Sequence, residues 1–315
     1  MQTFEAFDRQ FPTDDACKAF VAKMRWSDGK VSCPRCGATE RVYALKARPF
    51  HWLCKNKECG GRNGYRFSVI TRTIFQDTKV PLRQWFKVGY LMLTAKKGIS
   101  SMQVHRVVFG EESGSDRHTA WYMCHRWRAA MRGEAFPLDG ELEIDEMYVG
   151  GKSKNAHRGN RGKRTAAKPD GKHGNLIPPK IGVVGAIARK GNVVCKVIGS
   201  MEAPTIRTFV NRAVGDKVSL VATDEHPAYK KLAAAGIPHE SVNHAKGEYV
   251  RETVRGTVHT ANLDSFWSLF KRGVMGTFHK VSADYMPLYL NEFSFRHNNR
   301  KNANAFAALV ATCGQ

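Results

Sequence analysis

The chain has 315 residues, 42% of them hydrophobic, which is enough for two or three domains with buried cores. Its 50 Lys and Arg against 28 Asp and Glu give a net charge of +22, which favours a polyanion such as DNA or RNA as partner. The sequence has no run of about 18 apolar residues, no signal-peptide core and no evident lipidation signal. We therefore expect a cytoplasmic protein rather than a membrane or secreted one.

Four of the eight cysteines form two close pairs near the N-terminus. Cys33 and Cys36 are spaced C-x2-C, and Cys54 and Cys59 follow 17 residues later as C-x4-C, wider by two residues than the usual knuckle. In a cytoplasmic chain such pairs indicate metal ligands rather than disulfides, and the spacing predicts a tetrahedral structural Zn²⁺ site. Ahead of these cysteines, Thr13 is expected to cap a short helix that follows it directly. Short strands around the pairs complete a predicted zinc ribbon within residues 1–72: 41–45, 51–53 and 65–69.

Residues 73–135 have the periodicity of helices. Pro81 begins one, a Gly-Ile-Ser-Ser break at 98–101 precedes a second, and a third runs from Arg117 to Arg128. This rhythm suits a helix-turn-helix, with Arg117 and Arg126 as DNA-binding candidates, although a plain helical bundle fits the pattern equally well.

From residue 136 to 300 the pattern changes to that of an α/β domain. The alternating strand 142–149 is followed by residues 152–180, which hold nine Lys or Arg and one acid; we expect a loop that contacts phosphate through Lys152, Lys154 and Arg158. Further elements are expected in a fixed order, ending in a separate tail at 301–315. They are a hairpin at 181–198, a helix at 205–214, a strand at 218–223, and helices at 229–235, 263–274, 284–296 and 305–310.

Three aspartates occupy particular places in this order. Asp145 lies on the first strand, Asp224 at the end of the fourth and Asp264 on a late helix. This is the ground plan of an RNase H-like core, in which two neighbouring strands and one helix bring three carboxylates together. Such oxygens suit two Mg²⁺ or Mn²⁺ ions about 4 Å apart, which promote phosphodiester displacement, and Asp145 is the expected bridging ligand.

The late helix has an apolar stripe that includes Leu263, Phe266 and Trp267. Lys271 follows Asp264 by seven residues, two helical turns or about 10 Å, and is expected with Arg272 to contact DNA phosphate. Glu146 points to the opposite strand face and is expected to be structural. Three histidines are candidates for DNA contact or for local hydrogen bonding: His226, His244 and His259.

Taken together, these residues resemble bacterial insertion-sequence transposases of the DDE type that carry an N-terminal zinc ribbon, the ISXO-like group of the retroviral-integrase superfamily. The resemblance implies an enzyme that cuts and joins double-stranded DNA at its element's terminal inverted repeats and in target DNA, working as a homodimer or larger assembly. The matching stretches include Cys33-Pro-Arg-Cys-Gly37, Lys96-Lys-Gly-Ile-Ser-Ser-Met-Gln103, Asp145-Glu146 with Tyr148-Val-Gly-Gly-Lys152, Thr223-Asp224, His259-Thr260, Phe266-Trp-Ser268 and Lys271-Arg-Gly273.

The third acid of such enzymes is commonly Glu, whereas this chain has Asp264, which is shorter by one methylene. Some relatives use Asn in the triad, so Asn262 is a second candidate ligand. Two other functions remain open: a DNA-binding protein without catalytic activity, and a nuclease of the same fold without strand transfer.

Overall fold

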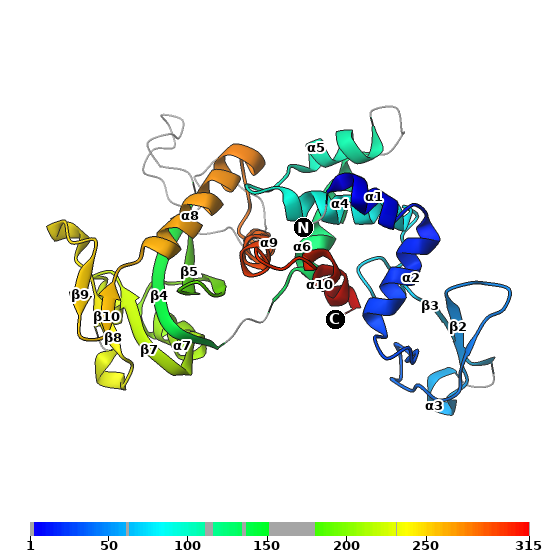
Figure 1. The fold of residues 1–315 in the computed structure, drawn as a ribbon, viewed down its shortest axis with the longest axis horizontal. Helices are drawn as coiled ribbons and strands as arrows, with labels where there is room; N and C mark the ends of the chain where they lie inside the picture. Colours follow the sequence, from blue (N-terminus) through cyan, green and yellow to red (C-terminus); the bar gives the residue numbers. More distant parts are fainter. Residues whose placement is uncertain are drawn as a thin grey trace, which may run out of the picture. The chain divides into compact units, whose positions relative to one another are not determined.

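The computed structural model describes residues 3–60, 63–110, 116–133, 137–150, 180–230 and 232–314. Contacts between Cα atoms divide the chain into two compact units. The first unit comprises Met1–Arg132 and Asn299–Gln315, and the second comprises Gly133–Asn298. Figure 1 labels most of the helices and strands of both.

Helices from both ends of the chain build the first unit. Thr13 caps α2 as expected, because its hydroxyl accepts a hydrogen bond from the Ala16 N–H at 3.2 Å. Aromatic rings pack in the core, where Phe306 lies 5.0 Å from Phe7 and 5.1 Å from Phe86 between ring centroids. The helices that meet here are α1 (Phe4–Gln10), α2 (Asp14–Arg25), α4 (Leu82–Thr94) and α10 (Ala305–Ala311).

A small antiparallel sheet lies between α2 and α4 in the sequence, as expected. Its strand order is β1-β2-β3, and Val42 pairs with Cys54 while Cys54 pairs with Tyr65. The elements are β1 (Val42–Ala44), β2 (His51–Cys54), α3 (Lys57–Gly60) and β3 (Tyr65–Ser68).

The middle region is helical, as expected. Helix α4 begins directly after Pro81, and Ser100 caps α5 by accepting a hydrogen bond from the Gln103 N–H at 3.2 Å. The remaining helices of this region are α5 (Ser101–Val104), a π-helical turn (His105–Phe109) and α6 (Arg117–Ala130). A helix-turn-helix function for this region remains a prediction.

A five-stranded mixed sheet forms the centre of the second unit in the described residues, with the order β6-β5-β4-β7-β8. Strands β4, β5 and β6 form the antiparallel meander, whereas β7 and β8 run parallel to β4. The strands are β4 (Leu138–Val149), β5 (Ile181–Ala188), β6 (Val193–Ile198), β7 (Val214–Thr223) and β8 (His239–Ser241).

Helices cover both faces of this sheet (Figure 1). Leu142 and Ile144 of β4 pack toward α7 (Ala203–Ala213), and Met147 packs toward α8 (Ala261–Gly273) and α9 (Met286–Asn298). Because side chains alternate along a strand, odd-numbered residues of β4 at this end face α8. A π-helical turn at Val274–Phe278 extends α8.

Some elements were not expected from the sequence. The sequence did not predict helix α1, strand β8 or the hairpin formed by β9 (Arg251–Thr253) and β10 (Gly256–Val258). The three strands have three residues each, which is too short to show an alternating pattern. The predicted helix at 229–235 is wrong. The described residues there form two 3₁₀ turns instead, Pro227–Tyr229 and Ala233–Ala235, because Pro227 and Gly236 bound a segment too short for a stable α-helix.

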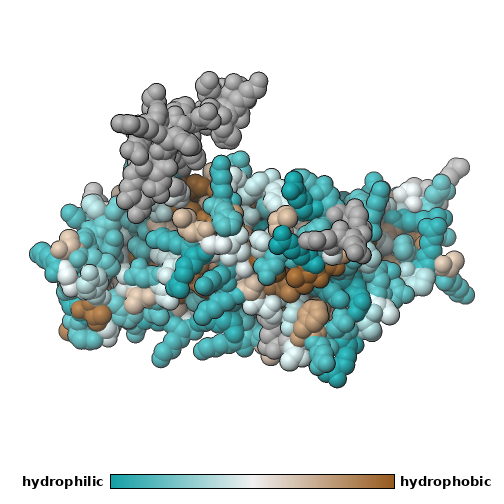
Figure 2. All heavy atoms as spheres, turned by 90° about the horizontal axis from the view of Figure 1, so that it is seen from above, coloured by the Kyte–Doolittle hydropathy of each residue, from teal (hydrophilic) through white to brown (hydrophobic). Residues whose placement is uncertain are grey.

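Hydrophilic residues cover most of the face drawn in Figure 2, with small hydrophobic patches between them. Within the described residues, we find no helix with the length and apolar character needed to cross a membrane.

Candidate active site and metal site

The four cysteines of the small sheet form a compact thiol cluster. Their sulfur atoms all lie within 4.8 Å of one another, with Cys33 Sγ 3.5 Å from Cys59 Sγ and Cys36 Sγ 3.8 Å from Cys54 Sγ. A tetrahedron with Zn–S bonds of about 2.3 Å has sulfur–sulfur edges of about 3.8 Å. The donor set and its spacing therefore fit Zn²⁺, despite the wider second pair.

The thiol of Cys36 is favoured as a thiolate. A hydrogen bond from the Ala38 backbone lowers its pKa to about 7. Burial, in contrast, raises the pKa of the Cys59 thiol above its ordinary value. Since only the thiolate is a good ligand, the lowered pKa of Cys36 favours metal binding near neutral pH, whereas the burial of Cys59 opposes it.

Asp145 lies on β4, the central strand of the large sheet. It shares the face of Met147 and therefore points toward α8. Across the strand pair it is opposite Gly185, where an added Cβ would lie 2.6 Å from Cζ2 of Trp267. Only a glycine at this position lets α8 pack so closely beside Asp145.

Asp224 follows the last residue of β7 directly. The parallel register pairs Glu143 with Ala222, so continuing it by two residues brings Asp224 beside Asp145. One Asp224 carboxylate oxygen accepts a hydrogen bond from the His226 N–H at 2.9 Å, which holds the turn after the strand.

Asp264 lies in the first turn of α8. Its Oδ2 accepts a hydrogen bond from the Thr260 hydroxyl at 3.0 Å, so its side chain is oriented by the residue before the helix. Asp264 is exposed, whereas Asp145 and Asp224 are partly buried.

The pKa of Asp145 is raised to about 7, first by burial and then by the negative charges of Glu146, Asp224 and Asp264, against a lowering hydrogen bond from its backbone neighbour. Asp224 and Asp264 therefore both lie close enough to Asp145 for their charges to act on its carboxyl group. The spacing of the three aspartates is wider than that of the cysteines, which are the only group of described His, Cys, Asp or Glu residues whose ligand atoms all lie within 4.8 Å. Two cations about 4 Å apart need a set of oxygens spread more widely than the ligands of one ion.

Glu146 lies at the edge of this acidic group. Its carboxylate accepts a hydrogen bond from the Tyr229 hydroxyl and lies 3.5 Å from Nδ1 of His226. Burial raises its pKa, and the hydrogen bond from Tyr229 opposes that rise. These contacts are those of a side chain with a structural role, as expected for Glu146. They also show that His226 has a local partner in Glu146.

Two parts of the chain match models of known protein families. Residues 137–298 match the ISXO2-like transposase domain, and residues 12–75 match the transposase zinc-ribbon domain. The first match alone spans more than half of the chain. The chain belongs to the ISXO2-like transposase family. The expected family is therefore confirmed.

This ISXO2-like chain is also similar to an uncharacterized protein in transposable element ISH50 of Halobacterium salinarum. The two are 28% identical over 291 residues, which cover 91% of this chain and 92% of the relative.

The basic residues predicted to bind DNA have different surroundings. Lys271 and Arg272 are exposed on α8, and Arg117 is exposed at the start of α6. Arg126 instead donates hydrogen bonds to the carbonyls of Thr73 and Ile74, so its guanidinium supports the first unit. Three predicted contacts lie outside the described residues: Lys152, Lys154 and Arg158.

Two candidate side chains turn out to contact a residue that the sequence did not single out. The Asn262 amide donates to the Glu143 carboxylate at 2.7 Å, and His259 Nδ1 lies 3.1 Å from the same carboxylate. His244 packs against Tyr249 in a tilted arrangement, with ring centroids 5.2 Å apart. No sequence signal separates Glu143 from the neighbouring acids, since its partners come from distant elements.

Proposed function

We propose that this chain is a DDE-type transposase that binds the terminal inverted repeats of its element and catalyses Mg²⁺-dependent cleavage and strand transfer of double-stranded DNA. It acts in the cytoplasm, and pairing of two element ends calls for a dimer or larger assembly. The membership in a transposase family supports the class of activity. The strand order β6-β5-β4-β7-β8, with β4 central, supports an RNase H-like fold for the catalytic unit.

One observation carries the proposal. Asp224 follows β7 at the level of Asp145 on the neighbouring strand β4, and Asp145 faces α8, which holds Asp264 in its first turn. The charges of Asp224 and Asp264 accordingly raise the pKa of Asp145. Like charges are costly to bring together in a partly buried site, unless the site serves to bind cations.

In the proposed mechanism, the carboxylates of Asp145, Asp224 and Asp264 would hold the divalent cations. Bound Mg²⁺ or Mn²⁺ supplies the Lewis acidity that activates a water or a DNA 3′-hydroxyl and stabilises the leaving oxygen. The exposed Lys271 and Arg272 contact DNA phosphates along α8 and thereby align the scissile bond.

The zinc ribbon and α6 supply further DNA contacts in this proposal, with Arg117 on the helix and the four cysteines holding a structural Zn²⁺. The net charge of +22 supplies the long-range attraction that such contacts need.

Asp224→Asn tests the proposal, with Asp216→Asn, an exposed acid on the same strand, as the matched control. Purified protein is mixed with DNA that carries the sequences flanking its gene. We expect Mn²⁺-dependent nicking and joining by the wild type and the control, and neither by Asp224→Asn, whose DNA binding is retained.

Each alternative function predicts a different result. Cleavage without joined products would indicate a nuclease of the same fold. Binding without cleavage in Mg²⁺ or Mn²⁺ by the wild type would indicate a DNA-binding protein and refute the proposal.

A further inference from the structure

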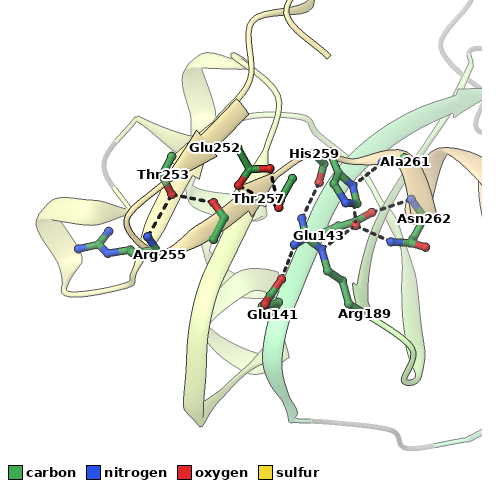
Figure 3. Close-up of polar contacts among 11 residues, drawn as sticks. Glu141, Glu143, Arg189, Glu252, Thr253, Arg255, Thr257, His259, Ala261 and Asn262 are labelled. Atoms are coloured by element: carbon green, nitrogen blue, oxygen red, sulfur yellow. Dashed lines mark hydrogen bonds and ion pairs between the residues drawn. The ribbon is translucent and has the colours of Figure 1, made fainter. Parts of the chain in front are cut away.

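A buried carboxylate connects the central strand to the start of α8. Glu143 is 0% exposed and lies on β4 two residues before Asp145. Figure 3 shows Asn262, His259 and Arg189 around it. Its Oε2 accepts hydrogen bonds from the backbone N–H groups of Asn262 at 2.9 Å and Leu263 at 3.0 Å.

These two N–H groups belong to the first turn of α8, which has no side-chain cap of its own from Thr260. A helix usually receives its capping oxygen from the residue just before it. Here the oxygen comes from a strand 119 residues earlier in the chain. The negative charge of Glu143 also complements the positive end of the helix dipole.

The remaining contacts make the burial of this charge tolerable. Arg189, just beyond β5, donates from Nε to Glu143 Oε1 at 3.1 Å and also pairs with Glu141. His259 Nδ1 lies 3.1 Å from Glu143 Oε1 and accepts a hydrogen bond from the Ala261 N–H at 3.3 Å, so the ring lies between the carboxylate and the start of α8. The carboxylate, itself on β4, thus has partners just after β5, just before α8 and in the first turn of α8, so it joins three elements.

The position of Asp264 depends on the same contacts. It directly follows Leu263, whose N–H is bound by Glu143, and an Asp side chain is too short to compensate for a displaced helix. On β4, Glu143 and Asp145 face the same way and lie about 7 Å apart along the strand. Strand β4 therefore carries both Glu143, which binds the start of α8, and Asp145, the carboxylate beside which Asp264 has to lie.

We propose that Glu143 is a positioning residue that sets the separation of Asp264 from Asp145 and so the affinity of the site for divalent cations. This inference rests on the proposed function. It assigns Asn262 and His259 to the support of α8 through Glu143.

The test compares Glu143→Gln with Glu252→Gln in the full-length, zinc-loaded chain. Glu252 is an exposed acid that accepts a hydrogen bond from Thr257 at 2.9 Å on the β9–β10 hairpin. Mn²⁺ binding is followed by electron paramagnetic resonance titration, alongside the Mn²⁺ dependence of DNA cleavage. We expect Glu143→Gln to raise the half-saturating Mn²⁺ concentration about 10–100-fold, with DNA binding in chelator unchanged. The control should match the wild type.

A second pair of variants separates positioning from general stability. In an Asp264→Glu background, the longer side chain recovers reach, so Glu143→Gln should weaken Mn²⁺ binding less than it does beside Asp264. Equal losses in the two backgrounds, or normal Mn²⁺ binding by Glu143→Gln, would overturn the inference.

Should Glu143→Gln fail to fold, Glu143→Asp replaces it, because it keeps the charge but cannot reach both N–H groups. The same loss of Mn²⁺ affinity is expected, and normal affinity would again overturn the inference. If the wild type neither binds Mn²⁺ nor cleaves DNA, the proposed function itself is wrong.

Discussion

Replacing Gly185 by alanine should push α8 away from the sheet. The added Cβ would lie 2.6 Å from Cζ2 and 2.8 Å from Cη2 of Trp267. Carbon atoms pack at about 3.5–4.0 Å, so the indole must retreat by about 1 Å. Overpacking of this kind costs about 1–3 kcal/mol, and each kcal/mol lowers the Tm of a unit of this size by about 2–4 °C.

The same displacement should reduce activity more than stability. Asp264 lies one helical turn before Trp267, so it moves with the indole, and a misplacement of about 1 Å costs about 100-fold in rate. Thermal unfolding and Mn²⁺-dependent cleavage are measured for Gly185→Ala and for Gly199→Ala, whose added Cβ meets nothing within 4 Å. Trp267→Phe should partly restore the Gly185→Ala variant. If the two alanine variants prove indistinguishable, the reasoning about close packing is refuted.

Three further perturbations have expected outcomes. The pKa of Asp145 rises from 3.8 to about 7 on folding, so between these pH values the folded chain holds a proton that the unfolded chain has lost. Without divalent cations, the free energy of unfolding should therefore fall as pH rises through this window, and Asp145→Asn should flatten that part of the curve measured by denaturant titration. Cys36→Ser should release zinc and unfold the ribbon, as read by a zinc indicator and circular dichroism, whereas Cys195→Ser should retain the metal; zinc retained by both variants would contradict the assignment. Lys271→Ala should reduce the slope of log affinity for DNA against log salt by about 1, while an unchanged slope would place Lys271 away from phosphate.

The order of elements in the second unit was predictable because its strands are long and apolar. Alternation identified the strand with Asp145, and the apolar stripe of α8 placed Asp264 on an exposed face. Strand β8 and the β9–β10 hairpin were not predictable, because three residues cannot establish a period.

The role of Glu143 was also beyond the reach of sequence patterns. It is one of several acids on β4, and nothing nearby in the sequence marks it as different. Its partners become apparent only when α8 packs on the sheet and brings Asn262 and Leu263 to it. Long-range capping leaves no local signature, whereas Thr13 caps a helix that follows it directly and was recognisable.

The first unit is interrupted in the chain by the whole of the second. Its aromatic core needs Phe306 of α10, which contacts Phe7 and Phe86 only after residues 133–298 have been synthesised. Domains generally fold as they emerge from the ribosome. The core of the first unit, in contrast, stays incomplete during translation until α10 has been synthesised. A gene copy with a premature stop codon between Asn298 and α10 would consequently produce a chain with an entire second unit but an incomplete first unit, the unit that also holds the zinc ribbon.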